Sequence, residues 1–137
     1  MRILNLLILL IGFLMFNTCT YLSGDKNLGT GYYYAEDGSF SCIIYSTTKP
    51  YKGAGLGVIP YEVTKFTCNK KYIIAMTLDD NNVVKSYWII DKSKEINLHD
   101  CHDQKSCDSL LTSNVTGPID SISFYNQLKE RNISLKF

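Results

Sequence analysis

The chain has 137 residues, of which 45% are hydrophobic and 20% are charged, a composition typical of a globular protein with a single domain. Fourteen Lys and Arg stand against thirteen Asp and Glu, so the formal net charge is only +1. A chain with no basic excess has little electrostatic attraction for phosphates. Nucleic acid is therefore excluded as an expected partner.

The first eighteen residues have the pattern of an export signal. Arg2 is the only charged residue before Asp25, and residues 3–16 form an apolar run interrupted only by Asn5 and Gly12. A positive charge followed by a short apolar run is typical of a signal peptide, and the run is too short for a comfortable transmembrane helix. We expect residues 1–18 to be removed and not to join the fold.

Cys19 follows this run directly. The segment Phe16-Asn17-Thr18-Cys19 resembles the lipobox of bacterial lipoproteins. The resemblance implies that Cys19 carries acyl chains such as palmitate, becomes the mature N-terminus and anchors the protein to a membrane of the cell envelope. Residues 19–30 are then a lipidated tether. The alternative is plain secretion, with cleavage nearby and Cys19 left as an ordinary cysteine.

Electrostatics would contribute little to membrane attachment. Once residues 1–18 are removed, thirteen basic and thirteen acidic side chains remain, so the mature chain is formally neutral. A neutral surface has no general attraction for anionic lipid headgroups. Acyl chains would therefore have to provide the attachment.

The other cysteines predict disulfides. If Cys19 carries lipid, an even number remains in an exported domain, where oxidation is permitted. Three pairings are possible for Cys42, Cys68, Cys101 and Cys107. We favour Cys42–Cys68 together with Cys101–Cys107, because the last two are close in sequence and enclose polar residues.

The segment around the last two cysteines also contains both histidines of the chain. A metal site is the alternative here, with His99, Cys101, His102 and Cys107 as ligands. The spacing does not match the usual paired zinc ligands, so we favour a disulfide-closed surface loop with solvated histidines. We assign no catalytic residue and expect no cofactor.

The first half of the domain predicts strands. Two runs rich in aromatic and β-branched residues, 31–35 and 41–47, are separated by a turn with Asp37-Gly38, which predicts a hairpin. Residues 49–57 contain one Pro and three Gly and predict a loop. A meander is expected from the runs 62–68, 72–78 and 83–91, whose alternation places apolar residues on both faces.

The second half predicts one helix. After a turn at 91–94 and a short strand at 95–98, Gly117-Pro118 leads to a helix that is capped by Asp120 or Ser121 and ends near Arg131. Ile122, Tyr125 and Leu128 are expected to pack on the sheet, and residues 133–137 to form a last strand. The expected fold is β-rich α+β, with a mainly antiparallel sheet and one C-terminal helix in a single domain over residues 31–137.

Several short motifs resemble a family of small bacterial lipoproteins of unknown function, of the Bacteroidota type. They are the start Gly31-Tyr32-Tyr33-Tyr34, the strand Tyr87-Trp88-Ile89-Ile90-Asp91 and the turn Thr116-Gly117-Pro118-Ile119 before a helix. The cysteine loop is an insertion relative to that pattern. The resemblance implies a location in the bacterial cell envelope, facing the periplasm or the exterior, and it implies no site residues.

Together these patterns predict a non-catalytic binding module of the envelope, whose partner is an envelope protein or a glycan. Two alternatives remain. One is a small metal-dependent or hydrolytic protein that uses the segment from His99 to Cys107. The other is a secreted inhibitor or immunity-type protein.

Overall fold

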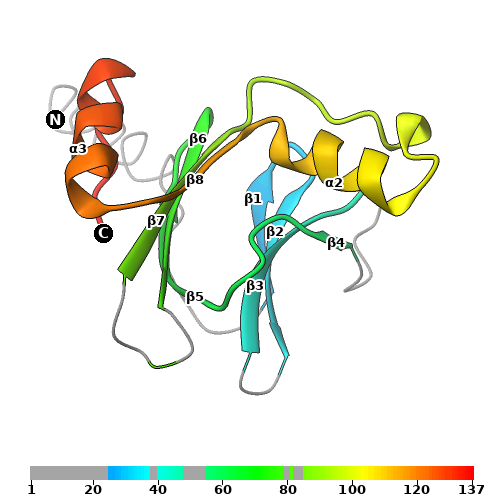
Figure 1. The fold of residues 1–137 in the computed structure, drawn as a ribbon, viewed down its shortest axis with the longest axis horizontal. Coiled ribbons are helices and arrows are strands. Elements are labelled where there is room, and N and C mark those ends of the chain that lie inside the picture. Colours follow the sequence, from blue (N-terminus) through cyan, green and yellow to red (C-terminus); the bar gives the residue numbers. More distant parts are fainter. Residues whose placement is uncertain (1–24, 38–39, 48–54, 79–80, 82–84) are drawn as a thin grey trace, which may run out of the picture.

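The computed structural model describes residues 25–37, 40–47, 55–78, 81 and 85–137. The expected export signal and the start of the expected tether lie outside these residues. The described part of the chain forms two antiparallel sheets of four strands and two α-helices, one of them close to the C-terminus (Figure 1). This confirms the β-rich α+β class.

The first sheet has the order β1-β2-β3-β4. Its strands are β1 (Lys26–Gly29), β2 (Tyr32–Asp37), β3 (Phe40–Tyr45) and β4 (Leu56–Gly57). The pairing of β2 with β3 confirms the expected hairpin.

Two boundaries differ from the expectation. β1 lies within the predicted tether, because Leu28 is only 2% exposed and its strand pairs with β2 from Lys26 onward. β4 lies at the end of the predicted Gly-rich loop and pairs with β3, while residues 49–54 of that loop are outside the described part.

The second sheet has the order β5-β6-β7-β8. Its first three strands confirm the predicted meander: β5 (Val63–Cys68), β6 (Tyr72–Leu78) and β7 (Lys85–Asp91). The fourth strand, β8 (Val115–Ile119), contains Gly117-Pro118, which we expected to be only a turn, and the peptide bond between them is cis. Gly117 has a φ of +149°, and a Cβ there would lie 2.6 Å from Cε3 of Trp88, so only glycine fits.

The alternation of side chains along β6 and β7 builds two cores, as predicted. One face faces the first sheet with Ile73, Ala75, Trp88 and Ile90, which join Tyr34, Tyr45 and Phe66. The other face carries Tyr72, Ile74 and Ile89 against the C-terminal helix. Figure 1 shows the second sheet between that helix and the first sheet.

The C-terminal helix α3 (Ser121–Glu130) begins as predicted, with Asp120 accepting a hydrogen bond from Ser123 N at 2.9 Å. Of the predicted buried stripe, Leu128 is buried as expected, but Ile122 is 74% and Tyr125 61% exposed, so the prediction is wrong for these two residues. Phe124, four residues before Leu128, faces the sheet together with it.

The chain after α3 does not form the expected strand. Asn132 has a φ of 53° and ends the helix as predicted. Ile133 N donates to the Leu128 carbonyl oxygen at 2.8 Å, which turns the chain back along the helix. Ile133 and Leu135 are buried by packing rather than by pairing in a sheet.

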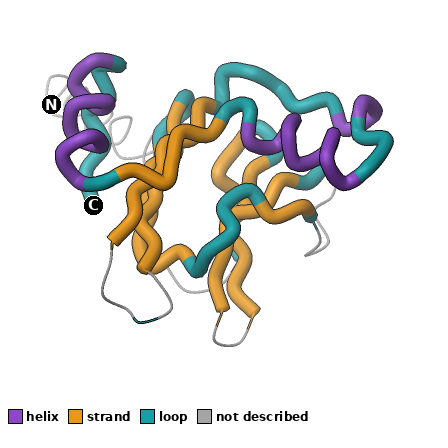
Figure 2. The backbone as a smooth tube through the Cα atoms, in the orientation of Figure 1, coloured by secondary structure: helices purple, strands orange, loops and turns teal. Residues whose placement is uncertain are grey.

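The connection between β7 and β8 also differs from the prediction. Residues 95–97 form no strand and lead into a short 3₁₀ helix, η1 (Leu98–Asp100), because Asn97 Oδ1 accepts from His99 N and begins a helical turn. A second α-helix, α2 (Gln104–Thr112), follows. Figure 2 shows α2 and α3 on opposite sides of the described chain.

Candidate functional site

A disulfide joins η1 to the first turn of α2. Cys101 and Cys107 are bonded, with their Cα atoms 4.7 Å apart, which confirms the expected pair. Both residues are partly exposed. The bond ties the segment after the 3₁₀ helix to a regular helix.

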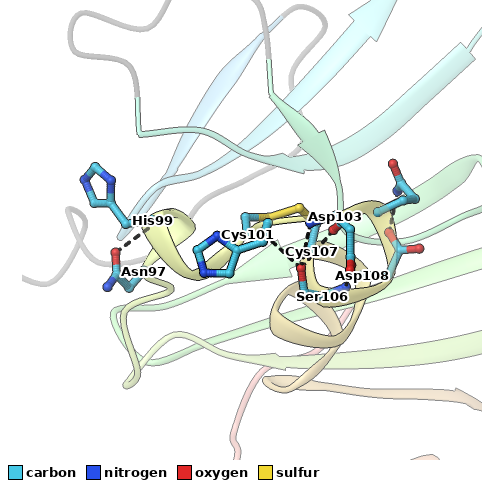
Figure 3. Close-up of a disulfide and its surroundings, with 9 residues drawn as sticks. Asn97, His99, Cys101, Asp103, Ser106, Cys107 and Asp108 are labelled. Carbon is cyan, nitrogen blue, oxygen red and sulfur yellow. Dashed lines mark hydrogen bonds between the residues drawn. A yellow bond between two sulfur atoms is a disulfide. The ribbon is translucent and has the colours of Figure 1, made fainter.

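The enclosed residues are not the irregular loop that we expected. Asp103 caps α2 by accepting from Ser106 N at 2.7 Å, while Ser106 Oγ accepts from Asp103 N at 3.0 Å (Figure 3). Hydrogen bonding of the Asp103 carboxylate by the backbone N–H and the side chain of Ser106 lowers the pKa of Asp103. Reciprocal capping makes residues 104–107 helical, and α2 is held to the core by the buried Leu111.

A hollow of about 630 Å³ lies beside this segment. It is lined by Thr47, just after β3, and by the consecutive residues Glu95, Ile96, Asn97, Leu98 and His99. Its size is in the range of small-molecule sites. The lining combines a hydroxyl, a carboxylate, a carboxamide and an imidazole with the partly buried side chain of Leu98, while the side chain of Ile96 is buried in the core. This combination suits a ligand with many hydroxyl groups and an apolar face.

Tyr45 holds one wall of the hollow in place. Its phenolic oxygen donates to the Ile96 carbonyl oxygen at 3.0 Å and accepts from Ile96 N at 3.2 Å. Tyr45 is 2% exposed and packs edge-on against the buried Tyr32. The segment that lines the hollow is thus anchored to the first sheet although it forms no strand.

The two histidines do not complete the alternative metal site. Cys101 and Cys107 are consumed by their disulfide, so neither offers a thiolate ligand. The side chain of His99 points away from the disulfide in Figure 3. His99 is one of the residues that line the hollow. Within the described ranges, no group of three or more His, Cys, Asp or Glu side chains could hold a metal ion.

The expected Cys42–Cys68 disulfide is wrong. Cys42 is a free, partly exposed thiol, and burial raises its pKa. Its neighbours in β3, Ser41 and Ile43, face the second sheet, with Ser41 Oγ donating to the Val63 carbonyl oxygen at 2.9 Å. Alternation therefore points Cys42 away from the core.

Cys68 lies inside that core and is fully buried.

Lys92 is a charged residue that sequence reasoning missed. Its side chain is only 4% exposed, and its ammonium donates to the Leu28 carbonyl oxygen of β1. Burial lowers the pKa of Lys92. Lys92 therefore joins the first strand to the turn after β7, a contact that only the tertiary structure creates.

The predicted anchor at Cys19 lies outside the described residues. None of the helices in the described ranges is long and apolar enough to cross a membrane. Comparison of the chain with protein-family models, with curated proteins and with solved structures found no match.

Sequence reasoning predicted the disulfide and singled out His99, but it did not identify the other residues that line the hollow. Glu95 and Thr47 carry no motif, and they meet only because Tyr45 draws the connecting segment onto the end of β3. Asn97 did carry a signal, because Asn before a short polar turn is a common helix cap. That signal predicts η1 but not the hollow.

Proposed function

We propose that this chain is an exported, lipid-anchored binding module of the bacterial cell envelope, without catalytic activity of its own, and that it binds an envelope glycan in the hollow at Glu95 to His99. The single observation that carries the binding role is this hollow beside a segment stiffened by a disulfide. A wall fixed in advance lowers the entropy cost of binding.

The chemistry of the lining favours a glycan. The hydroxyl of Thr47 can exchange hydrogen bonds with sugar hydroxyls, and the carboxylate of Glu95 is a strong acceptor for them. The partly buried side chain of Leu98 offers contact for the apolar face of a sugar ring.

Binding can be tested by saturation-transfer NMR with the acylated full chain in detergent micelles, using neutral and N-acetylated disaccharides as probes. We expect Glu95→Gln to weaken binding about tenfold, the effect of losing one charge-assisted hydrogen bond. Glu62→Gln, which removes an exposed carboxylate outside the hollow, is the matched control. Equal weakening by both variants, or no saccharide signal, would contradict the proposed site.

The anchor has a separate test. Cys19→Ala is expected to abolish incorporation of labelled palmitate and to release the protein from the membrane fraction or leave it unprocessed. The Cys42→Ala variant, which loses a free thiol elsewhere, should behave as the parent does.

Cys68 provides a second readout for the anchor. Cys19 is the only cysteine of the chain outside the described residues, and a sulfur that carries a lipid thioether cannot form a disulfide. Mass spectrometry of a non-reduced digest therefore decides between the two fates of this sulfur. A peptide that links Cys19 to Cys68 in the mature protein would overturn the proposed anchor.

A further inference from the structure

Three exposed apolar side chains form a patch at the start of α3 and at the C-terminal end of the described chain. Ile122 is 74%, Tyr125 61% and Phe137 45% exposed. We call these residues the α3 patch.

The buried ring of Phe124 joins the members of this patch. It lies 5.4 Å from the ring of Tyr125 and 5.9 Å from the ring of Phe137, measured between ring centroids. Ile122 is three residues before Tyr125 and so lies on the same side of the helix. Tyr125 and Phe137 are therefore both supported by the buried ring of Phe124.

The register of the strands relates this patch to the start of the domain. Asp25, just before β1, accepts a hydrogen bond from Glu36 N, and Glu36 pairs with Ser41. Ser41 binds the Val63 carbonyl oxygen at the start of β5, which brings the first sheet to the second.

Strand pairing in the second sheet relates the start of β5 to the start of α3. Val63 pairs with Thr77, Thr77 with Ser86, and the next residue, Tyr87, with Ile119 at the end of β8. α3 begins two residues later. The start of β1 and the first turns of α3 therefore lie at the same end of the two sheets.

We propose that the α3 patch rests on the lipid bilayer to which the chain is anchored. This inference depends on the acyl anchor at Cys19 proposed above. Only five residues separate Cys19 from Asp25, and an extended chain of that length reaches about 20 Å. The anchored end of the domain is thus held near the bilayer, and the patch lies at that end.

The chemistry of the patch suits a bilayer interface. Tyr combines an apolar ring with a polar hydroxyl and is enriched at membrane interfaces, while Ile and Phe enter the boundary between headgroups and acyl chains. Because the mature chain is formally neutral, contact should not require anionic lipids.

The test uses the acylated full chain reconstituted into phosphatidylcholine vesicles whose acyl chains carry bromine, a short-range quencher of tryptophan fluorescence. The native Trp88 is 4% exposed and provides a constant background. The Tyr125→Trp variant reports on the patch. Leu56→Trp is the control, because Leu56 is 38% exposed and pairs with Tyr45 at the opposite end of β3.

We expect brominated lipid to quench the Tyr125→Trp reporter several-fold more than the Leu56→Trp reporter, in neutral and anionic vesicles alike. Equal quenching of both reporters, with the protein still bound to vesicles, would overturn the docking while leaving the anchor intact. If the Cys19→Ala variant loses both vesicle binding and quenching of the patch reporter, the result supports the dependence of the docking on the anchor. A patch reporter that responds to protein concentration and not to brominated lipid would assign the patch to a second copy of the chain and overturn the proposal.

Discussion

The phenolic oxygen of Tyr45 makes hydrogen bonds to both backbone groups of Ile96, donating at 3.0 Å and accepting at 3.2 Å. The two residues are 51 positions apart in sequence. A single side chain thus provides the hydrogen bonds that a neighbouring strand would otherwise provide to the backbone of Ile96.

Tyr45→Phe tests this contact. The substitution keeps the ring but leaves the buried N–H and C=O of Ile96 without their partner. We therefore expect the free energy of unfolding to fall by about 1–3 kcal/mol. Urea denaturation measures the loss, and hydrogen exchange should show faster exchange at the Ile96 amide. Tyr61→Phe, at a residue 45% exposed, is the control and should change neither quantity. Unchanged exchange at Ile96 in Tyr45→Phe would show that the bonds do not hold the wall of the hollow.

Replacing Cys101 and Cys107 together by Ser should leave the domain folded. The ring that the disulfide closes is short, and its loop-closure entropy corresponds to about 2 kcal/mol. Because the capping pair Asp103 and Ser106 remains, α2 should persist, and the loss should appear in thermal unfolding rather than in helix content. Cys42→Ser serves as the comparison. A global loss of structure in the double variant would mean that the disulfide supports the core.

Phe124→Ala and Ile122→Ala separate the two sides of α3. Phe124 is fully buried and stacks on Tyr87 with ring centroids 4.7 Å apart, so its truncation should cost about 3–5 kcal/mol of unfolding free energy. Ile122 is 74% exposed, and its truncation should change stability by less than about 0.5 kcal/mol. Chemical denaturation of the two variants checks this contrast. Similar losses of unfolding free energy would mean that Ile122 packs on the sheet, as the sequence pattern predicted.

Lys92 predicts a dependence of stability on alkaline pH. Burial lowers its pKa in the folded protein from the ordinary value of 10.5, so the unfolded chain holds this proton to higher pH than the folded chain does. The contribution of Lys92 to the free energy of unfolding therefore rises as pH increases from the folded-state pKa toward 10.5.

This rise should be absent in Lys92→Met, which keeps an apolar chain of similar length without a titrating group. Lys94→Met, at an exposed residue of the same turn, should retain it. Urea midpoints measured across the alkaline range provide the comparison. Parallel curves for the parent and Lys92→Met would show that the ammonium is hydrated in the folded state.

Local sequence signals determined the elements that depend on neighbouring residues. The alternation along β6 and β7 predicted both the strands and the two buried faces, because the period of a strand is a property of its own backbone. Asp120 predicted the start of α3, since a cap acts within one turn. The pair Cys101–Cys107 followed from short spacing in the same way.

Only the tertiary structure decided features that join distant parts of the chain. Whether Cys42 faces Cys68 depends on which side of β3 meets the second sheet, and Ser41 and Ile43 take that side. β1 could not be predicted because most of its neighbours in sequence are polar. Its stability comes from the burial of Leu28 and from a hydrogen bond with Lys92, sixty-four positions away. The hollow has no sequence signature for the same physical reason: its lining converges through one hydrogen-bonded contact between Tyr45 and Ile96, and no local pattern encodes that distance.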